Sequence, residues 1–170
     1  MIKKKVCLIG AYAVGKTSLV RKYVDGIFSD EYLTTVGVKI DQRQENIDGT
    51  DILLMVWDIA GRDEVQPVQK SFLTRTDAFI YVIDGTRRET LDAVRVEMAE
   101  IRNDYPDAVS ILLANKYDLT EEWELEENEP AFEELRGEGL EILLTSAKTG
   151  ENVAEAFATV ARLAVRESNE

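Results

Sequence analysis

A glycine-rich segment, residues 10–17, has the residue types and spacing of a loop that holds phosphate groups. It reads GAYAVGKT and fits the pattern G-x-x-x-x-G-K-[ST]. It follows an apolar run and precedes apolar residues at helical spacing, so backbone N–H groups and a helix N-terminus would face a bound anion. Lys16 would reach the β- and γ-phosphates of a nucleotide, and Thr17 would offer its hydroxyl to Mg²⁺. The residues expected to contact the nucleotide here are Gly10, Ala13, Val14, Gly15, Lys16, Thr17 and Ser18.

A second candidate element, residues 58–61 (DIAG), follows a strand-like run. A carboxylate at the carboxyl end of a strand beside a phosphate loop is placed to hold Mg²⁺, usually through water, and this is the role expected for Asp58. Gly61 leaves room for its amide to approach the γ-phosphate. The D-x-x-G spacing is weak alone and becomes specific when it follows the glycine-rich loop at this distance.

Two polar segments further along the chain have the residue types needed to recognise guanine. Residues 115–118 (NKYD) and 145–148 (TSAK) each follow an expected strand. The Asp118 carboxylate can accept from N1–H and the 2-amino group of guanine, and the Ala147 N–H can donate to O6, whereas adenine matches neither. The aliphatic stems of the two lysines can lie on the faces of the base. The expected base-binding residues are Asn115, Lys116, Asp118, Ser146, Ala147 and Lys148.

The elements that must position these residues alternate between apolar runs and segments with helical periodicity. This pattern predicts βαβ units and a mostly parallel sheet. Asp48-Gly49, between two strand-like runs, predicts a tight hairpin and therefore one antiparallel strand. We expect a single α/β domain over residues 1–170, with a P-loop NTPase fold of about six strands and about five helices. The strands are expected at residues 6–9, 36–47, 52–57, 78–83, 109–114 and 140–144.

Composition excludes several other kinds of site. The chain has 170 residues, one cysteine and no histidine, so Cys/His zinc sites and a catalytic histidine are excluded, and Cys7 is expected in the core. The net charge of −13 would repel nucleic-acid phosphate and anionic lipid. No apolar stretch approaches the roughly 20 residues of a membrane-spanning helix. No lipidation motif is present, so we expect a cytoplasmic protein without an intrinsic membrane anchor.

Two charged segments have no assigned chemistry. Residues 3–5 are all lysine and are expected to form the solvated start of the first strand. Residues 120–141 are dense in glutamate. For this segment two interpretations stay open, a solvated acidic helix face and a docking surface for a basic partner.

With the four motifs in this order, the chain resembles the Ras superfamily of small GTPases from Lys5 to about Leu163. The tracts that look most like the Rab branch are residues 34–38 (TTVGV), 57–61 (WDIAG) and 149–153 (TGENV). The resemblance implies a switch that binds GTP or GDP with Mg²⁺ and hydrolyses GTP. It also implies that two switch regions, residues 28–38 and 61–72, meet effectors, exchange factors and GTPase-activating proteins.

The resemblance assigns roles that spacing alone does not. Thr35 matches the threonine that contacts Mg²⁺ and the γ-phosphate. Phe28 matches the aromatic residue that packs on the guanine edge, and a core phenylalanine after the first helix is the alternative. The implied catalytic residues are Lys16, Thr35, Gly61 and Arg62. The implied metal ligands are Thr17, Thr35 and Asp58.

Three positions depart from the family pattern. Arg62 stands where most of the family has the glutamine that orients the attacking water, and a guanidinium has donors only. Tyr12 replaces a small residue close to the γ-phosphate, and Ala13 replaces a common glycine. We therefore expect slow intrinsic hydrolysis with Arg62 exposed to solvent. The alternatives are that Arg62 acts as an arginine finger in cis, or that Asp63, Glu64 or a partner's residue orients the water.

Two other functions compete with a hydrolysing switch. A GTP-binding scaffold with negligible hydrolysis is the main alternative, and Arg62 and Tyr12 favour it modestly. A P-loop kinase or ATPase is disfavoured by Asp118 and by residues 146–148, which suit guanine.

Overall fold

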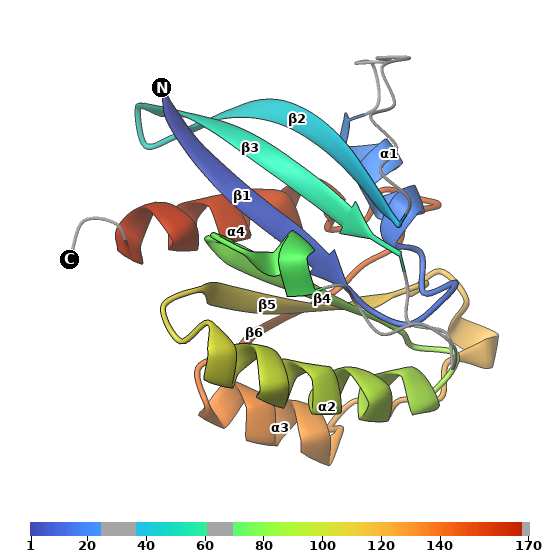
Figure 1. Cartoon of the computed structure of the whole chain (residues 1–170). Coiled ribbons are helices and arrows are strands. Elements are labelled where there is room, and N and C mark those ends of the chain that lie inside the picture. Colours follow the sequence, from blue (N-terminus) through green and yellow to red (C-terminus); the bar gives the residue numbers. More distant parts are fainter. Residues whose placement is uncertain (25–36, 61–69, 168–170) are drawn as a thin grey trace.

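The computed structural model describes residues 1–24, 37–60 and 70–167, and a six-stranded sheet runs through this part of the chain (Figure 1). The strand order is β2-β3-β1-β4-β5-β6. The strands are β1 (Ile2–Ile9), β2 (Val38–Ile47), β3 (Thr50–Ile59), β4 (Ala78–Asp84), β5 (Val109–Asn115) and β6 (Glu141–Leu144).

Neighbouring strands are parallel except for β2 and β3, which form the expected hairpin. At its turn Asp48 and Gly49 have φ values of 51° and 85°, the left-handed values that a tight hairpin turn needs. Parallel strands require crossover connections, and helices supply most of them here. The expected α/β fold with one antiparallel strand is confirmed.

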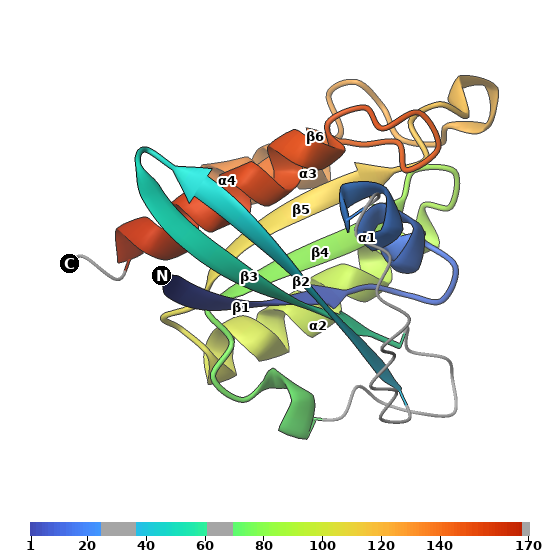
Figure 2. The same ribbon diagram turned by 90° about the horizontal axis from the view of Figure 1, so that it is seen from above.

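Helices cover both faces of the sheet (Figure 2). The described residues contain the α-helices α1 (Lys16–Val24), α2 (Glu89–Asp104), α3 (Pro130–Gly137) and α4 (Val153–Glu167), and the 3-10 helices η1 (Lys70–Leu73) and η2 (Thr120–Glu122). One apolar layer lies between the sheet and α1 with α4, and a second lies between the sheet and α2 with α3. Tyr23 of α1 stacks on Phe157 of α4 with ring centroids 3.8 Å apart. This contact anchors the helix that follows the glycine-rich loop.

The lysine run belongs to the sheet. β1 begins at Ile2 rather than at residue 6, because it pairs with β3 from its first residue. Lys3 is exposed, but Lys4 is only 7% exposed and its Nζ lies 3.4 Å from Oδ1 of Asp77. The expectation of a solvated start is therefore wrong for Lys4, since alternate side chains of a strand turn toward opposite faces.

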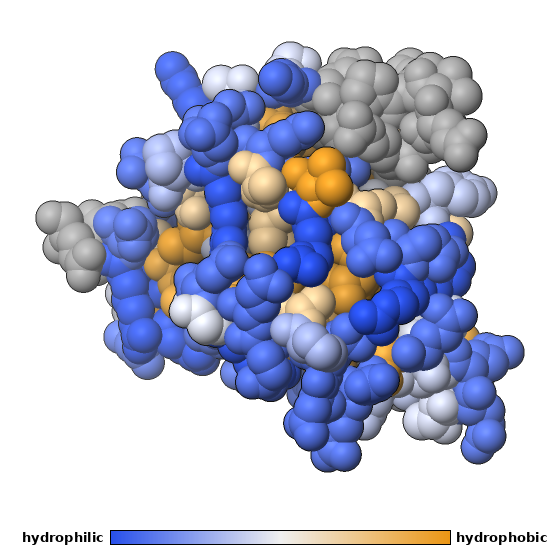
Figure 3. Space-filling view, turned by 90° about the horizontal axis from the view of Figure 1, so that it is seen from below, coloured by the Kyte–Doolittle hydropathy of each residue, from blue (hydrophilic) through white to orange (hydrophobic). Residues whose placement is uncertain are grey.

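The glutamate-rich segment pairs with three arginines spaced seven residues apart beside and along α2. The pairs are Arg88–Glu129, Arg95–Glu134 and Arg102–Glu138. Figure 3 views the molecule from the side of α2 and α3 and shows a predominantly hydrophilic surface. Most of the segment's glutamates are exposed, as a solvated face would be, but Glu129 is 1% exposed. Its hydrogen bond from Arg88 is the main cause that lowers the pKa of Glu129.

Cys7 is fully buried, as expected of a core residue. Its Sγ lies 3.2 Å from Oγ1 of Thr76, and burial raises the pKa of the thiol to about 11. Among the described helices, none combines the length and the apolar content needed to cross a membrane.

Candidate functional site

The glycine-rich segment forms the loop between β1 and α1, at the carboxyl end of a central strand. Two positions in this loop require glycine because other parts of the chain approach them closely. A Cβ at Gly10 would overlap the carbonyl oxygen of Val82 on β4, and a Cβ at Gly15 would overlap the side-chain amide of Asn115. Gly15 also has a φ of +101°, which favours glycine. The backbone of this loop is therefore held directly against β4 and against the end of β5.

Lys16 opens α1, and its ammonium group folds back onto the loop. Its Nζ donates to the carbonyl oxygens of Gly10 and Ala11 over 3.1 and 3.4 Å, and the residue is 6% exposed. Burial lowers the pKa of Lys16, while the charges of Asp58 and Glu97 act in the opposite direction. A buried cation is costly unless an anion compensates it, so this position suits a phosphate ligand.

Thr17 and Asp58 come together from the start of α1 and the end of β3. The Thr17 hydroxyl donates to Oδ2 of Asp58 over 2.6 Å, and Asp58 is 8% exposed. Burial raises the pKa of Asp58, whereas the hydrogen bond from Thr17 and the charge of Lys16 lower it. These two hard oxygens fit Mg²⁺, which takes one or two protein oxygens together with waters and phosphate oxygens. Within residues 1–24, 37–60 and 70–167, no three His, Cys, Asp or Glu side chains cluster as a metal site of their own.

Asn115, the last residue of β5, joins the phosphate loop to the expected base-binding segments. Its Nδ2 donates to the carbonyl oxygen of Val14 over 3.0 Å. Its Oδ1 accepts from the Thr145 hydroxyl and from the Ala147 N–H, each over 3.2 Å. The Ala147 amide, expected to donate to guanine O6, thus contacts Asn115 in this structure. One buried side chain therefore sets the spacing between loops from three parts of the sequence.

The Asp118 carboxylate is held in place from the neighbouring segment. The Ser146 hydroxyl donates to Oδ1 of Asp118 over 2.7 Å, and Ser146 Oγ accepts from the Thr149 N–H over 3.1 Å. Lys116 adopts a φ of 70°, a conformation that costs a residue with a side chain about 1 kcal/mol. Backbone strain of this kind concentrates at functional sites.

These segments surround an open cavity of about 450 Å³. Its lining residues are Gly15, Ser18, Asn115, Lys116, Asp118, Leu119, Ala147 and Lys148. The volume lies within the roughly 300–1,000 Å³ of typical small-molecule sites. Because the phosphate loop and both expected base-binding segments line one cavity, a single ligand can reach all of them.

Residues 5–166 match the family model described as Ras family. The chain belongs to the Ras family. It is 32% identical over 160 residues to Ras-related protein Rab-26 of Bos taurus, covering 93% of this chain and 62% of that protein. It is 33% identical over 162 residues to Ras-related protein Rab-24 of Dictyostelium discoideum, covering 94% and 80%. The chain thus spans less than two thirds of the length of its Rab-26 relative, and the expected Rab-like character is confirmed.

Several site residues carried over from the Ras family lie outside the described residues. They are Phe28, Thr35, Gly61 and Arg62, together with Asp63 and Glu64 as alternatives for orienting water. Of the two other departures from the family pattern, Tyr12 is 75% exposed on the phosphate loop. Ala13 has a φ of 62°, where the common glycine would be unstrained.

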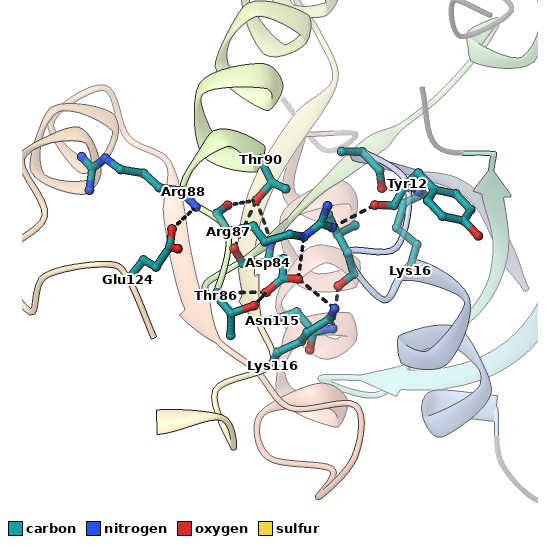
Figure 4. Close-up of polar contacts among 12 residues, drawn as sticks. Tyr12, Lys16, Asp84, Thr86, Arg87, Arg88, Thr90, Asn115, Lys116 and Glu124 are labelled. Atoms are coloured by element: carbon teal, nitrogen blue, oxygen red, sulfur yellow. Dashed lines mark hydrogen bonds and ion pairs between the residues drawn. The ribbon is translucent and has the colours of Figure 1, made fainter. Parts of the chain in front are cut away.

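Two residues beside the Ras-family motifs were missed by sequence reasoning. Asp84 ends β4, and Arg87 lies in the connection to α2 (Figure 4). Both contact residues of the expected site, since Arg87 donates to the Tyr12 carbonyl and Asp84 pairs with Lys116. A signal for Asp84 was present, because it is a carboxylate at the carboxyl end of an apolar strand. Arg87 offered none, because an arginine in a polar connection is usually solvated.

Proposed function

We propose that this Ras-family chain forms one domain over residues 1–170 and binds GTP and GDP with Mg²⁺. It acts as a molecular switch that hydrolyses GTP slowly in the absence of a partner. The observation that carries this proposal is the hydrogen bond from Asn115 to the Val14 carbonyl, which joins the phosphate loop to the base-binding segments around one cavity. Family membership supports the same function, and the relatives are named Ras-related proteins.

Each described group has a defined task in the proposed complex. Lys16 balances the charge of the β- and γ-phosphates, and Thr17 and Asp58 hold Mg²⁺. Bound Mg²⁺ neutralises the charge that develops on the phosphate oxygens during hydrolysis. Asp118, oriented by Ser146, accepts from the two guanine donors. The contacts proposed from the resemblance are Phe28, Thr35, Gly61 and Arg62, in the regions where effectors and regulators would bind.

Nucleotide specificity is the first test. We expect excess GDP with Mg²⁺ to raise the free energy of unfolding by about 2.7 kcal/mol at a concentration of 100 times its Kd. ADP should have no such effect, because adenine leaves the Asp118 carboxylate without donors. Asp118→Ala should abolish the GDP effect, and the matched variant Asp107→Ala, at an exposed position outside the cavity lining, should retain it. Equal stabilisation by ADP would contradict guanine binding.

Single-turnover hydrolysis of bound GTP, followed by release of phosphate, separates a slow switch from a scaffold. We expect a rate near or below the family's intrinsic value of about 10⁻⁴ per second. Arg62→Gln should raise this rate if the missing glutamine limits hydrolysis. GTP that stays bound without turnover in both proteins would instead support the scaffold function, which the exposed Tyr12 on the phosphate loop also favours.

A further inference from the structure

Arg87 bridges the two ends of the candidate site (Figure 4). Its Nη2 donates to the carbonyl oxygen of Tyr12 over 2.9 Å, and its Nε donates to Oδ2 of Asp84 over 3.0 Å. The same carboxylate oxygen lies 2.8 Å from Nζ of Lys116. A continuous chain of polar contacts therefore runs from the phosphate loop through Arg87 and Asp84 to the base-binding segment.

Asp84 lies at the centre of this series of polar contacts and is buried. The Asp84 side chain is 1% exposed, while those of Arg87 and Lys116 are 36% and 32% exposed. The other oxygen of Asp84 accepts from the backbone N–H and the hydroxyl of Thr86 over 2.9 and 2.6 Å. Both oxygens of the carboxylate are therefore engaged, and two cations share one of them.

We propose that Arg87 is a positioning residue that couples the phosphate loop to the base-binding segment and slows the release of bound guanine nucleotide. The inference rests on the proposed guanine-nucleotide binding and assigns to Arg87 a part in it.

The peptide between Tyr12 and Ala13 explains the effect at the phosphate end. In a trans peptide the carbonyl oxygen and the following N–H point in opposite directions, and the described residues contain no cis peptide. A donor on the Tyr12 carbonyl therefore fixes the direction of the Ala13 N–H, one of the amides expected to contact phosphate. The left-handed φ of 62° at Ala13 is less favourable for alanine than for glycine. The hydrogen bond from Arg87 therefore helps to hold this peptide in its conformation.

The Nε of Arg87 acts through Asp84 on the expected base-binding segment. Lys116, whose aliphatic stem is expected to lie on the base, has its ammonium group held by Asp84. Without Arg87, Asp84 would lose one of its two cationic partners and the Tyr12 carbonyl would lose its donor. The phosphate loop and Lys116 could then move independently, and nucleotide release would require the opening of only one of them.

The rate of dissociation of fluorescent GDP, measured with Mg²⁺ and excess unlabelled GDP, tests this inference. We expect Arg87→Gln to release GDP about tenfold faster than the wild type, the equivalent of about 1.4 kcal/mol. Arg87→Lys keeps the charge but loses the two-armed fork, so its rate should lie between the two. The matched control is Arg95→Gln, which removes an arginine of α2 that is also 36% exposed and pairs with Glu134 of α3. Its rate should stay within twofold of the wild type.

Three outcomes would overturn the proposal. The first is an Arg87→Gln rate equal to that of Arg95→Gln while the wild type holds GDP, which leaves the proposed function intact. The second is a loss of thermal stability in nucleotide-free Arg87→Gln as large as that in the GDP-bound protein, because Arg87 would then support the fold alone. The third is a wild type that binds no guanine nucleotide, which would remove the proposed function as well.

Discussion

Two separate effects favour glycine at position 15, and their contributions to stability can be measured separately. Its φ is +101°, and a Cβ there would overlap the Asn115 amide. Gly49, in the hairpin turn, has a φ of +85° with nothing within 4 Å of a Cβ. Gly49→Ala therefore reports the backbone strain alone, about 1 kcal/mol.

We predict that Gly15→Ala lowers the free energy of unfolding by at least about 2 kcal/mol more than Gly49→Ala, because it displaces Asn115 from the Val14 carbonyl. It should also abolish GDP binding, which Gly49→Ala should leave intact. Urea unfolding and GDP titration check both effects. Equal destabilisation by the two variants would show that the Asn115 contact contributes nothing at this site.

The contribution of Asp84 to the stability of the fold depends on pH. Burial by itself would raise its pKa, but the hydrogen bonds from Lys116, Thr86 and Arg87 outweigh burial and lower the pKa from 3.8 to about 2. The folded chain thus binds this proton more weakly than the unfolded chain does. Asp84 therefore stabilises the fold above pH about 4, and its contribution disappears as the pH falls from about 4 to about 2.

We predict that Asp84→Asn is less stable than the wild type by about 2 kcal/mol at pH 6, and that the difference shrinks toward zero near pH 2. Denaturant unfolding at a series of pH values measures it. A difference that stays constant across this range would mean that the carboxylate charge has no stabilising role and that the loss comes from replacing an acceptor oxygen with an NH₂ donor.

Trp123, in the connection after β5, packs against Gly85, in the connection after β4. A Cβ on Gly85 would overlap the Trp123 ring, and the Glu124 N–H donates to the Gly85 carbonyl over 2.8 Å. The rings of Trp123 and Tyr117 also pack nearly perpendicular to each other, with centroids 5.2 Å apart. Tyr117 belongs to the segment that carries Asp118, so this packing supports the expected base-binding segment.

We predict that Gly85→Ala lowers the free energy of unfolding by about 1–3 kcal/mol, because the added methyl group must push the indole away. In a Trp123→Leu background the same change should lose most of its effect, since the clashing ring is absent. Urea unfolding of the wild type, the two single variants and the double variant gives the coupling energy. Simple additivity would show that Gly85 is required for its backbone alone.

Sequence patterns predicted the elements better than their tertiary contacts. Alternation of apolar runs and the Asp48-Gly49 turn were sufficient for the strands and the hairpin, because these are local signals. Spacing also located the motifs, which parallel strands bring to one edge of the sheet. The burial of Lys4 and the bridge made by Arg87 could not be predicted, because each depends on a partner far away in the sequence.

The whole molecule carries a net charge of −13, from 20 basic and 33 acidic residues. Much of this charge lies on surfaces where like charges repel over the Debye length, about 30 Å at 10 mM salt and about 8 Å at 150 mM. The ion pairs between α2 and the glutamate-rich segment oppose this repulsion, but exposed pairs contribute only about 0–1 kcal/mol each.

We predict that the thermal unfolding midpoint rises between 10 and 150 mM NaCl, because screening weakens the repulsion in the compact state more than it weakens the few surface pairs. Differential scanning calorimetry at fixed pH, without nucleotide, measures this. A midpoint that falls with salt would show that the ion pairs outweigh the net charge.

Asn115 and Val14, which are in contact, are separated by 101 positions in the sequence, so the ribosome adds Asn115 long after Val14. A ribosome extends a chain by about 5–20 residues per second, so roughly 5 to 20 seconds separate the two residues. Until Asn115 emerges, the phosphate loop has neither its amide donor nor a base-binding segment beside it. Under the proposed function, a nascent chain has therefore synthesised β1 to β5 before its phosphate loop gains the Asn115 contact that supports nucleotide binding.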